Sequence, residues 1–398
     1  MTRLQVFMDK PYYPYSPIAS IDSLSLTLGV VPKVLLDIAK NSSNSYTEFI
    51  VPSKNKDRLV YEPKYELKKI QKRINARLFE KVQYPLYLQG GIKDNLVKRD
   101  YVENAKLHVK SKHLINLDIK AFYDNIKPHH VFSVYKYLFK FPDDVCDVLT
   151  QLTTYKNRVP QGACTSSYIA NLIFFNDEYT LVSSFRQQGI SYSRLLDDVT
   201  LSSNKELSSE DVTNAIKKVA ALFKKYDLRL KNSKTKIEVK SNKEAEYKVT
   251  GLWIGNGEPK VRKDERRYIR QLVYICGLKY AKSSSCQEYH KFWNKISGMV
   301  AKLTRLNHPE AAKLRVKLSN ILPTFSVEVK RKVIHDIKKL MRKPATQGSY
   351  TLGEIARVNN SMYLLGILGR TDFNLARNLR RDLKRKYKNL PTYNQIWS

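Results

Sequence analysis

The alternation of apolar and polar residues predicts a short buried strand near the middle of the chain. Leu114, Ile115 and Leu117 are apolar and lead directly into Asp118, after which residues 121–123 turn toward helix. A carboxylate at the end of a buried strand is costly to desolvate unless it holds a metal ion or another partner. Asp118 is therefore a candidate site residue, although a helix-capping or turn aspartate would explain this segment taken alone.

A second pattern predicts a β-hairpin that carries two adjacent carboxylates. The apolar pair Leu195-Leu196 precedes Asp197 and Asp198, and the alternating, β-prone residues 199–202 follow them. We expect the hairpin to turn at the two aspartates. Like charges this close destabilise one another, and a divalent cation would offset the repulsion.

A turn and a helix are predicted between these two strand segments. Pro160-Gln161-Gly162 is a turn signal, and the apolar spacing after it predicts a helix from 166 to 174. A glycine before a helix lets the backbone approach a nucleotide closely, and a neighbouring glutamine can touch sugar, base or phosphate.

The last third of the chain is predicted to be basic and helical, since Val329, Val333, Ile337 and Leu340 recur at helical spacing among lysines and arginines. The chain has 71 Lys and Arg against 37 Asp and Glu, a net charge of +34, and residues 258–398 supply 31 − 10 = +21 of it. Such a surface favours a polyanion as partner, because Lys and Arg release counterions from phosphates. A membrane is a weaker candidate, since the tyrosines are spread along the chain.

Composition also limits the class of protein. A hydrophobic fraction of 42% over 398 residues suffices for packed cores in two or three domains. No apolar run approaches the ~18 residues of a membrane-spanning helix, and the N-terminus lacks the apolar core of a signal peptide. The four cysteines form no CxxC pair, so we expect a soluble, cytoplasmic protein without a disulfide framework.

Two strands that each deliver aspartate to one place suit two-metal phosphoryl transfer. In that chemistry two Mg²⁺ ions ~3.5–4 Å apart stabilise the attacking and leaving oxygens, and magnesium prefers carboxylates, water and substrate phosphates. The order of strand aspartate, Pro-Gln-Gly turn and Asp-Asp hairpin resembles the three palm motifs of reverse transcriptases. The resemblance covers about residues 50–320 and implies an α+β, right-hand polymerase that makes DNA on an RNA template.

The resemblance implies a domain order and a set of catalytic residues. The implied domains are fingers (1–110 and 136–160), palm (111–135 and 161–256), a helical thumb (257–325) and a basic helical C-terminal extension (326–398), with a break at 344–348. Asp118, Asp197 and Asp198 are the implied ligands of two Mg²⁺ ions. Lys234, with Lys236 as the alternative, is the implied residue at the leaving pyrophosphate.

Four further residues resemble the nucleotide-binding positions of the family. Arg58, Gln161 and Gly162 are implied to contact the incoming dNTP. Tyr123 is implied to pack under its sugar and to exclude a 2′-hydroxyl, with an aromatic core position as the alternative. The sequence departs from the family at Leu195, where a tyrosine is usual, and this puts primer placement and fidelity in question.

Two short motifs resemble those of bacterial retron reverse transcriptases and of related phage-defence enzymes. Asn104 and His108 match an NAxxH motif, and Val249-Thr250-Gly251 match a VTG triplet. The resemblance implies that these residues bind a cognate structured noncoding RNA, that the RNA–DNA duplex and dNTPs are further partners, and that the protein acts in antiviral defence. For His108, a structural hydrogen bond is the open alternative.

Other activities and partners remain open from the sequence. The same site could add DNA without a template, or start DNA on a protein hydroxyl at Tyr12, Tyr13, Tyr15 or Tyr393. A catalytically idle RNA-binding scaffold is the alternative from another class. An effector or toxin protein and an oligomer are candidate partners. His129-His130 follow a proline, and we expect them in a solvated turn.

Overall fold

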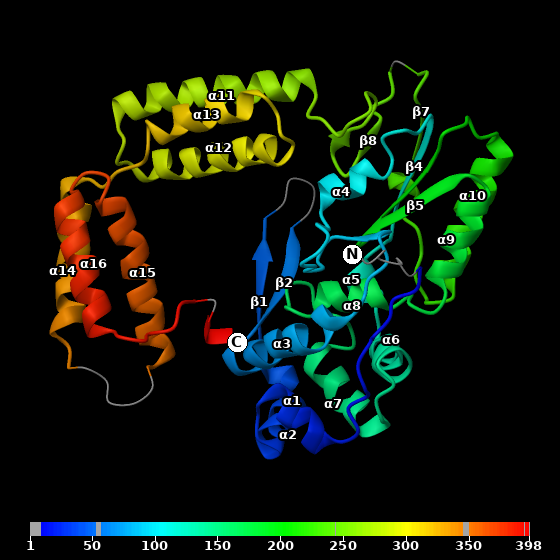
Figure 1. Cartoon of the computed structure of the whole chain (residues 1–398), viewed down its shortest axis with the longest axis horizontal. Coiled ribbons are helices and arrows are strands. Elements are labelled where there is room, and N and C mark those ends of the chain that lie inside the picture. Colours follow the sequence, from blue (N-terminus) through cyan, green and yellow to red (C-terminus); the bar gives the residue numbers. More distant parts are fainter. Residues whose placement is uncertain (1–8, 53–56, 243, 345–349, 394, 398) are drawn as a thin grey trace, which may run out of the picture. The chain divides into compact units, whose positions relative to one another are not determined.

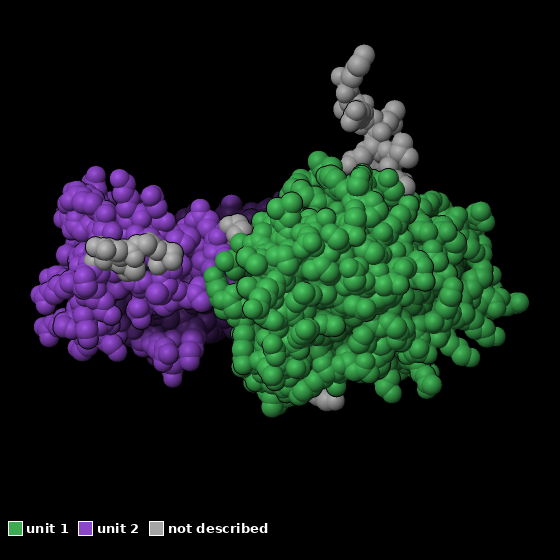
Figure 2. Space-filling model, turned by 90° about the horizontal axis from the view of Figure 1, so that it is seen from below, with its two compact units in different colours: residues 1–260 green, residues 261–398 purple. Residues whose placement is uncertain are grey.

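The computed structural model describes residues 9–52, 57–242, 244–344, 350–393 and 395–397. The chain divides into two compact units, residues 1–260 and 261–398, which are coloured separately in Figure 2. The boundary lies close to residue 256, the predicted end of the palm. The finer division into fingers, palm, thumb and extension stays a prediction. No described helix is long and apolar enough to cross a membrane.

A five-stranded sheet is the scaffold of the first unit (Figure 1). In spatial order its strands are β3 (Leu88–Gln89), β5 (Ile190–Leu195), β6 (Asp198–Ser203), β4 (His113–Asp118) and β7 (Lys236–Val239). All neighbours are antiparallel except β3 and β5. Strand β4 lies between β6 and β7 and has five of its six residues buried, which explains why its sequence is almost wholly apolar. The predicted strand before Asp118 is confirmed.

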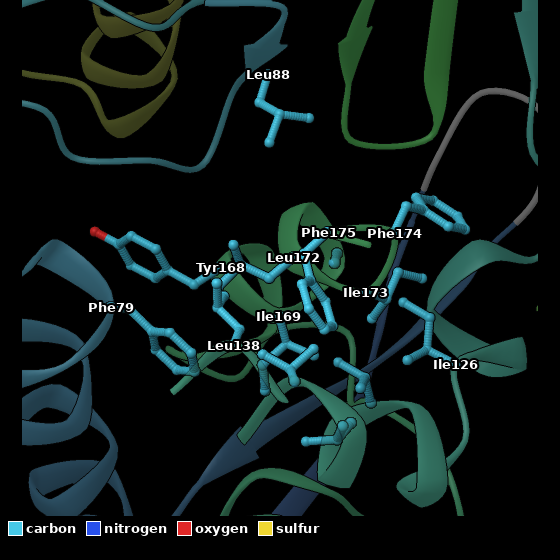
Figure 3. Close-up of a cluster of buried hydrophobic side chains, with 14 of the residues drawn as sticks. Phe79, Leu88, Ile126, Leu138, Tyr168, Ile169, Leu172, Ile173, Phe174 and Phe175 are labelled. Carbon is cyan, nitrogen blue, oxygen red and sulfur yellow. The ribbon is translucent and has the colours of Figure 1, made fainter. Parts of the chain in front are cut away.

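The described part of the first unit contains ten helices. They are α1 (Ile21–Leu28), α2 (Pro32–Lys40), α3 (Tyr65–Arg77), α4 (Tyr101–Lys106), α5 (Phe122–Asn125), α6 (Pro128–Ser133), α7 (Asp143–Thr153), α8 (Ser166–Leu172), α9 (Glu178–Gln187) and α10 (Ser209–Lys224). Helix α8 confirms the helix predicted after the Pro-Gln-Gly turn. Its Ile169 and Leu172 lie in the buried apolar cluster of Figure 3, while α9 packs on β5 and on α10.

Two smaller hairpins complete the first unit. The longer one pairs β1 (Tyr46–Val51) with β2 (Arg58–Pro63) in antiparallel register. The shorter one pairs β8 (Lys248–Val249) with β9 (Leu252–Trp253). Thr250 and Gly251 form the turn of the shorter hairpin and both have positive φ, 46° and 80°. The predicted VTG triplet is therefore a hairpin turn.

The second unit is helical, as predicted for the end of the chain. Its helices are α11 (Lys263–Lys282), α12 (Gln287–Arg305), α13 (Glu310–Ser319), α14 (Val327–Arg342), α15 (Leu352–Leu368) and α16 (Phe373–Lys386). The predicted apolar stripe of α14 is confirmed for Val333, Ile337 and Leu340, which are buried in a cluster with α15 and α16, whereas Val329 is 42% exposed. The predicted break at 344–348 falls between α14 and α15, and its residues 345–348 lie outside the described residues.

Candidate active site

Three aspartates meet at one end of the five-stranded sheet. Asp118, the last residue of β4, lies directly opposite Asp198, the first residue of β6. The backbone N–H of Ile119 donates a hydrogen bond of 3.0 Å to the carbonyl of Asp197, which joins the end of β4 to the hairpin turn. The pairing of two strands thus brings together carboxylates that are far apart in the sequence.

The hairpin turns one residue earlier than the sequence predicted. Strand β5 ends at Leu195 and β6 begins at Asp198, which pair with each other, so the two turn residues are Leu196 and Asp197. The prediction of a turn at the two aspartates was wrong by one position, because Asp198 is already the first residue of β6 and pairs with Leu195 of β5 and with Asp118 of β4. Leu196 has φ of 59°, a left-handed conformation that a leucine rarely adopts without support from its surroundings.

The pKa values of Asp197 and Asp198 are both raised. Asp198 is an exposed residue, yet partial desolvation of its carboxylate and the charges of Asp197 and Asp118 raise its pKa to about 6. Desolvation and the Asp118 charge also raise the pKa of Asp197, against the lowering effect of Lys234 and Arg58. A divalent cation would relieve this repulsion, and carboxylate oxygens are the ligands that Mg²⁺ prefers. The residues therefore fit magnesium.

Lys234 reaches this cluster from the loop before β7. Its Nζ donates a hydrogen bond to Oδ2 of Asp118, and this bond raises the pKa of the ammonium. The backbone N–H of Lys231 donates to the carbonyl of Asp118 at 2.8 Å, which fixes the loop beside the strand. Lys236 instead forms an ion pair with Glu246 at 2.8 Å. Of the two lysines considered from the sequence, Lys234 is the one beside the carboxylates.

The Pro-Gln-Gly turn lies against strand β2. The carbonyl of Gln161 accepts a hydrogen bond of 2.8 Å from the N–H of Tyr61. Gly162 has φ of 110°, and a Cβ there would lie 2.4 Å from Cγ1 of Val60. Only glycine allows the backbone of the turn to lie this close to Val60. The Pro-Gln-Gly turn is therefore held against β2, the strand that begins at Arg58. Arg58 itself is exposed.

Tyr123 follows the strand aspartate on α5 and is half-buried. Desolvation and the charge of Asp197 raise its pKa to about 12, so the ring lies close enough to the cluster to sense its charge. It also packs on the apolar core and tilts against Phe122 at 5.8 Å between ring centres. Both sequence interpretations, a nucleotide contact and a core residue, fit this position.

Asn104 and His108 are buried, at 0% and 1% exposure. The His108 ring bridges two strands, with Nδ1 2.7 Å from Oγ of Ser202 and Nε2 2.7 Å from Oγ of Ser193. The Ser193 hydroxyl in turn donates to Oδ1 of Asn104 at 2.7 Å. The structural hydrogen bond that the sequence left open for His108 is present. A direct RNA contact by these two side chains stays a prediction that their burial does not favour.

The VTG turn is joined to the same region. The Thr250 hydroxyl donates a hydrogen bond of 2.9 Å to the carbonyl of Tyr101 in α4. Val249 is buried, whereas Gly251 is exposed and a Cβ there would meet no atom within 4 Å. The two retron-type motifs are therefore linked in space, and the accessible part is the turn at Thr250 and Gly251.

His129 and His130 depart from their sequence prediction. They lie in helix α6 rather than in a turn, and His130 is only 6% exposed, whereas His129 is exposed as predicted. Among the described residues, they form with Asp227 the one group of three metal-ligand types within 4.8 Å of one another. Nδ1 of His130 accepts the N–H of Lys127 at 3.1 Å, which leaves the proton of the neutral ring on Nε2 and argues against metal binding there.

The tyrosines considered as protein primers differ in exposure. Tyr12, Tyr15 and Tyr393 are about half exposed, whereas Tyr13 packs against Phe139 with ring centres 4.7 Å apart. The three N-terminal tyrosines, Tyr12, Tyr13 and Tyr15, line a hollow of 890 Å³ whose lining includes none of Asp118, Asp197 and Asp198. Protein priming stays a prediction that this placement does not favour.

One feature of the site was missed in the sequence. Arg194, two residues before the turn, is fully buried and forms an ion pair with buried Glu178 of α9 at 2.6 Å. The signal was present, since an arginine inside a buried strand requires a partner, but the sequence does not show which carboxylate provides it.

Comparisons with known proteins show the family of this chain. The family model of reverse transcriptases (RNA-dependent DNA polymerases) matches residues 38–255. The chain is 44% identical over 382 residues to the Retron Se72 reverse transcriptase of Salmonella heidelberg (strain 579083-10), which spans 94% of this chain and 98% of that one. It is 33% identical over 333 residues to the Retron Ec48 reverse transcriptase of Escherichia coli, 80% of each chain.

A telomerase structure from Candida albicans in complex with a telomeric RNA fragment aligns with 85% of this chain and 66% of its own, at a TM-score of 0.40 and 9% identity. The family model matches more than half of the chain, and the two retron relatives cover 94% and 80% of it. The chain therefore belongs to the retron reverse transcriptases, which are RNA-directed DNA polymerases of mixed α and β structure.

Proposed function

We propose that Asp118, Asp197 and Asp198 form the polymerisation site of this retron reverse transcriptase and bind two Mg²⁺ ions. The observation that carries the proposal is the register of β4 against β6, which sets these three carboxylates at one end of the sheet beside Lys234. When bound, magnesium neutralises phosphate charge and makes the primer hydroxyl more acidic.

The remaining chemistry belongs to the side chains. The ammonium of Lys234, kept protonated by its hydrogen bond to Asp118, stabilises the negative charge of the leaving pyrophosphate and can give it a proton. Arg58, whose charge acts on Asp197, holds the triphosphate. Catalysis then consists mainly of positioning and charge neutralisation.

The nucleotide pocket selects a deoxynucleotide. The backbone of Gln161 and Gly162 contacts the nucleotide, and the contact of this turn with β2 holds that backbone in place. The half-buried Tyr123 ring, close to Asp197, excludes the 2′-hydroxyl of a ribonucleotide. A phenol with a pKa near 12 stays neutral, so the ring acts by its shape.

The template is a cognate structured noncoding RNA, bound partly through Thr250 and Gly251. The VTG turn presents these residues beside α4, while Asn104 and His108 hold α4 against the sheet. The excess of basic residues supplies phosphate contacts to this RNA and to the RNA–DNA duplex. The biological setting that we propose is antiviral defence in a bacterial cell, with an effector protein as further partner.

A polymerisation assay tests the site and the template together. The purified protein with its copurified RNA receives Mg²⁺ and labelled dNTPs, with and without prior RNase treatment. Asp197→Asn should abolish incorporation, whereas Asp264→Asn, an exposed aspartate of α11, should leave it unchanged. Sequencing the copurified RNA identifies the template.

Each outcome separates one interpretation from the others. A product that disappears after RNase supports RNA-directed synthesis. A product that survives RNase indicates template-independent addition, and a product covalently attached to protein indicates a tyrosine primer. Undiminished incorporation by Asp197→Asn would refute the metal site.

A further inference from the structure

Arg194 satisfies every one of its N–H groups inside the protein. The guanidinium is 0% exposed, and a guanidinium carries five donors and no acceptor. Nε and Nη2 bind the two carboxylate oxygens of Glu178 at 2.6 and 2.8 Å. The remaining donors bind the carbonyls of Ala170 (3.1 Å), Asn171 (3.0 Å) and Leu196 (3.2 Å). Five donors therefore meet five acceptors.

These acceptors belong to elements on both sides of the candidate active site. Ala170 and Asn171 lie in the last turn of α8, the helix that follows the Pro-Gln-Gly turn. Leu196 is the first residue of the turn that carries Asp197. A cation at the C-terminal end of a helix is favourable, and the guanidinium also lies 5.0 Å from the ring centre of Phe174 (labelled in Figure 3). The Arg194 side chain thus connects α8, which follows the proposed nucleotide-binding turn, to the turn that carries the proposed metal ligand Asp197.

The turn needs such a connection because its backbone is strained. Leu196 has φ of 59°, and a bulky residue keeps this conformation only when its surroundings determine it. Arg194 holds the carbonyl of Leu196, while the N–H of Ile119 holds the next carbonyl, that of Asp197. Both carbonyls of the two turn residues are therefore fixed from outside the turn.

We infer that Arg194 is a positioning residue for polymerisation, which holds the Asp197 turn in its strained conformation and in fixed register with α8. The inference rests on the proposed role of Asp197 as a metal ligand. Arg194 touches neither nucleotide nor metal, so its effect passes through the backbone of the turn. Glu178 has a supporting role, because it orients the guanidinium and balances its charge.

The test is Arg194→Lys, which keeps the charge but offers three donors from a single nitrogen and cannot serve both the carboxylate and the carbonyls. We expect kcat for dNTP incorporation to fall about 10-fold to 100-fold and the Mg²⁺ concentration for half-maximal rate to rise. The affinity for copurified RNA should stay unchanged.

The matched control is Arg99→Lys. Arg99 is also buried, forms an ion pair with Asp94 at 2.8 Å, and donates to the carbonyls of Tyr84, Pro85 and Leu88. None of these partners belongs to the turn, so its substitution should lower Tm while leaving the Mg²⁺ dependence at the wild-type value. An equal shift of Mg²⁺ dependence in both variants would overturn the inference.

Glu178→Gln covers the case in which Arg194→Lys does not fold. The amide keeps one oxygen for Nε, and the variant should show a smaller change of the same kind in kcat and Mg²⁺ dependence. Wild-type values in whichever of the two variants folds would overturn the inference. Asp197→Asn separates this failure from failure of the proposed function. If Asp197→Asn is inactive and Arg194→Lys has wild-type kinetics, the positioning role alone is refuted. If Asp197→Asn is active, the proposed metal site is refuted.

Discussion

Asp118 and Asp198 face each other across two antiparallel strands, so the fold holds two like charges side by side. Partial desolvation and the neighbouring carboxylates raise the pKa of Asp198 to about 6. A raised carboxylate pKa means that the metal-free fold loses stability as pH rises through that value, because the ionised form is less favourable in the folded state than in the unfolded state.

Asp198→Asn should therefore stabilise the metal-free protein and reduce its activity. Removing the repulsion should raise the free energy of unfolding at pH 7.5 by about 1 kcal/mol, a modest value because this side chain reaches solvent. Thermal unfolding with EDTA measures the gain, and added Mg²⁺ should stabilise the wild type more than the variant. A variant less stable than the wild type in EDTA contradicts the account.

His108 makes a second prediction on pH dependence. Burial lowers its pKa from 6.5 to about 3. Between pH 6.5 and pH 3 the histidine is therefore protonated in the unfolded state and neutral in the folded state. The stability is fully present above pH 6.5 and falls as pH decreases, by about 2 kcal/mol between pH 6.5 and 5 from this residue alone. Urea denaturation at a series of pH values measures the slope.

His108→Gln isolates this contribution from those of the other buried histidines. Burial also lowers the pKa of His130, to about 4, and this group titrates in both proteins. The variant should be less stable at pH 7.5, because it cannot bridge Ser193 and Ser202, but its stability should decline less steeply toward pH 5. Parallel declines would show that His108 is not buried as a neutral ring.

The sequence predicted the strand before Asp118, the Asp-Asp hairpin and the helix after Gly162, because apolar spacing and turn residues are local signals. The position of the turn at Leu196 was not predictable from propensity, since a leucine is unfavourable at positive φ and only strand register and the Arg194 contact place it there. His108 likewise required tertiary information, because its hydroxyl partners lie on two strands distant in sequence. The candidate metal ligands were predictable from their residue types and spacing in the sequence. The side-chain contacts that support them were not, because those contacts join residues far apart in the sequence.

Gly162 supports a prediction about the nucleotide pocket. Gly162→Ala combines an unfavourable φ of 110° with a Cβ only 2.4 Å from Val60, so it should lower the free energy of unfolding by about 2–3 kcal/mol. Because the turn would move away from β2, the KM for dNTP should also rise. Chemical denaturation and steady-state kinetics measure the two effects.

Gly189→Ala is the matched control for backbone strain. Gly189 has φ of 71°, and a Cβ there would meet no atom within 4 Å. It should lose about 1 kcal/mol from backbone conformation alone, with an unchanged KM for dNTP. If the two alanine variants lose equal stability, the close approach of the Pro-Gln-Gly turn to β2 is not tight.

Tyr123 is tested by separating its ring from its hydroxyl. Its pKa of about 12 keeps the phenol neutral near Asp197, so selection against a 2′-hydroxyl should depend on the bulk of the ring. Tyr123→Val should raise the ratio of rNTP to dNTP incorporation by 10-fold or more, about 1.4 kcal/mol of lost discrimination. Tyr123→Phe, which keeps the ring and its packing on Phe122, should retain the wild-type ratio. Loss of selectivity in the phenylalanine variant would assign discrimination to the hydroxyl, and unchanged selectivity in the valine variant would make Tyr123 a core residue only.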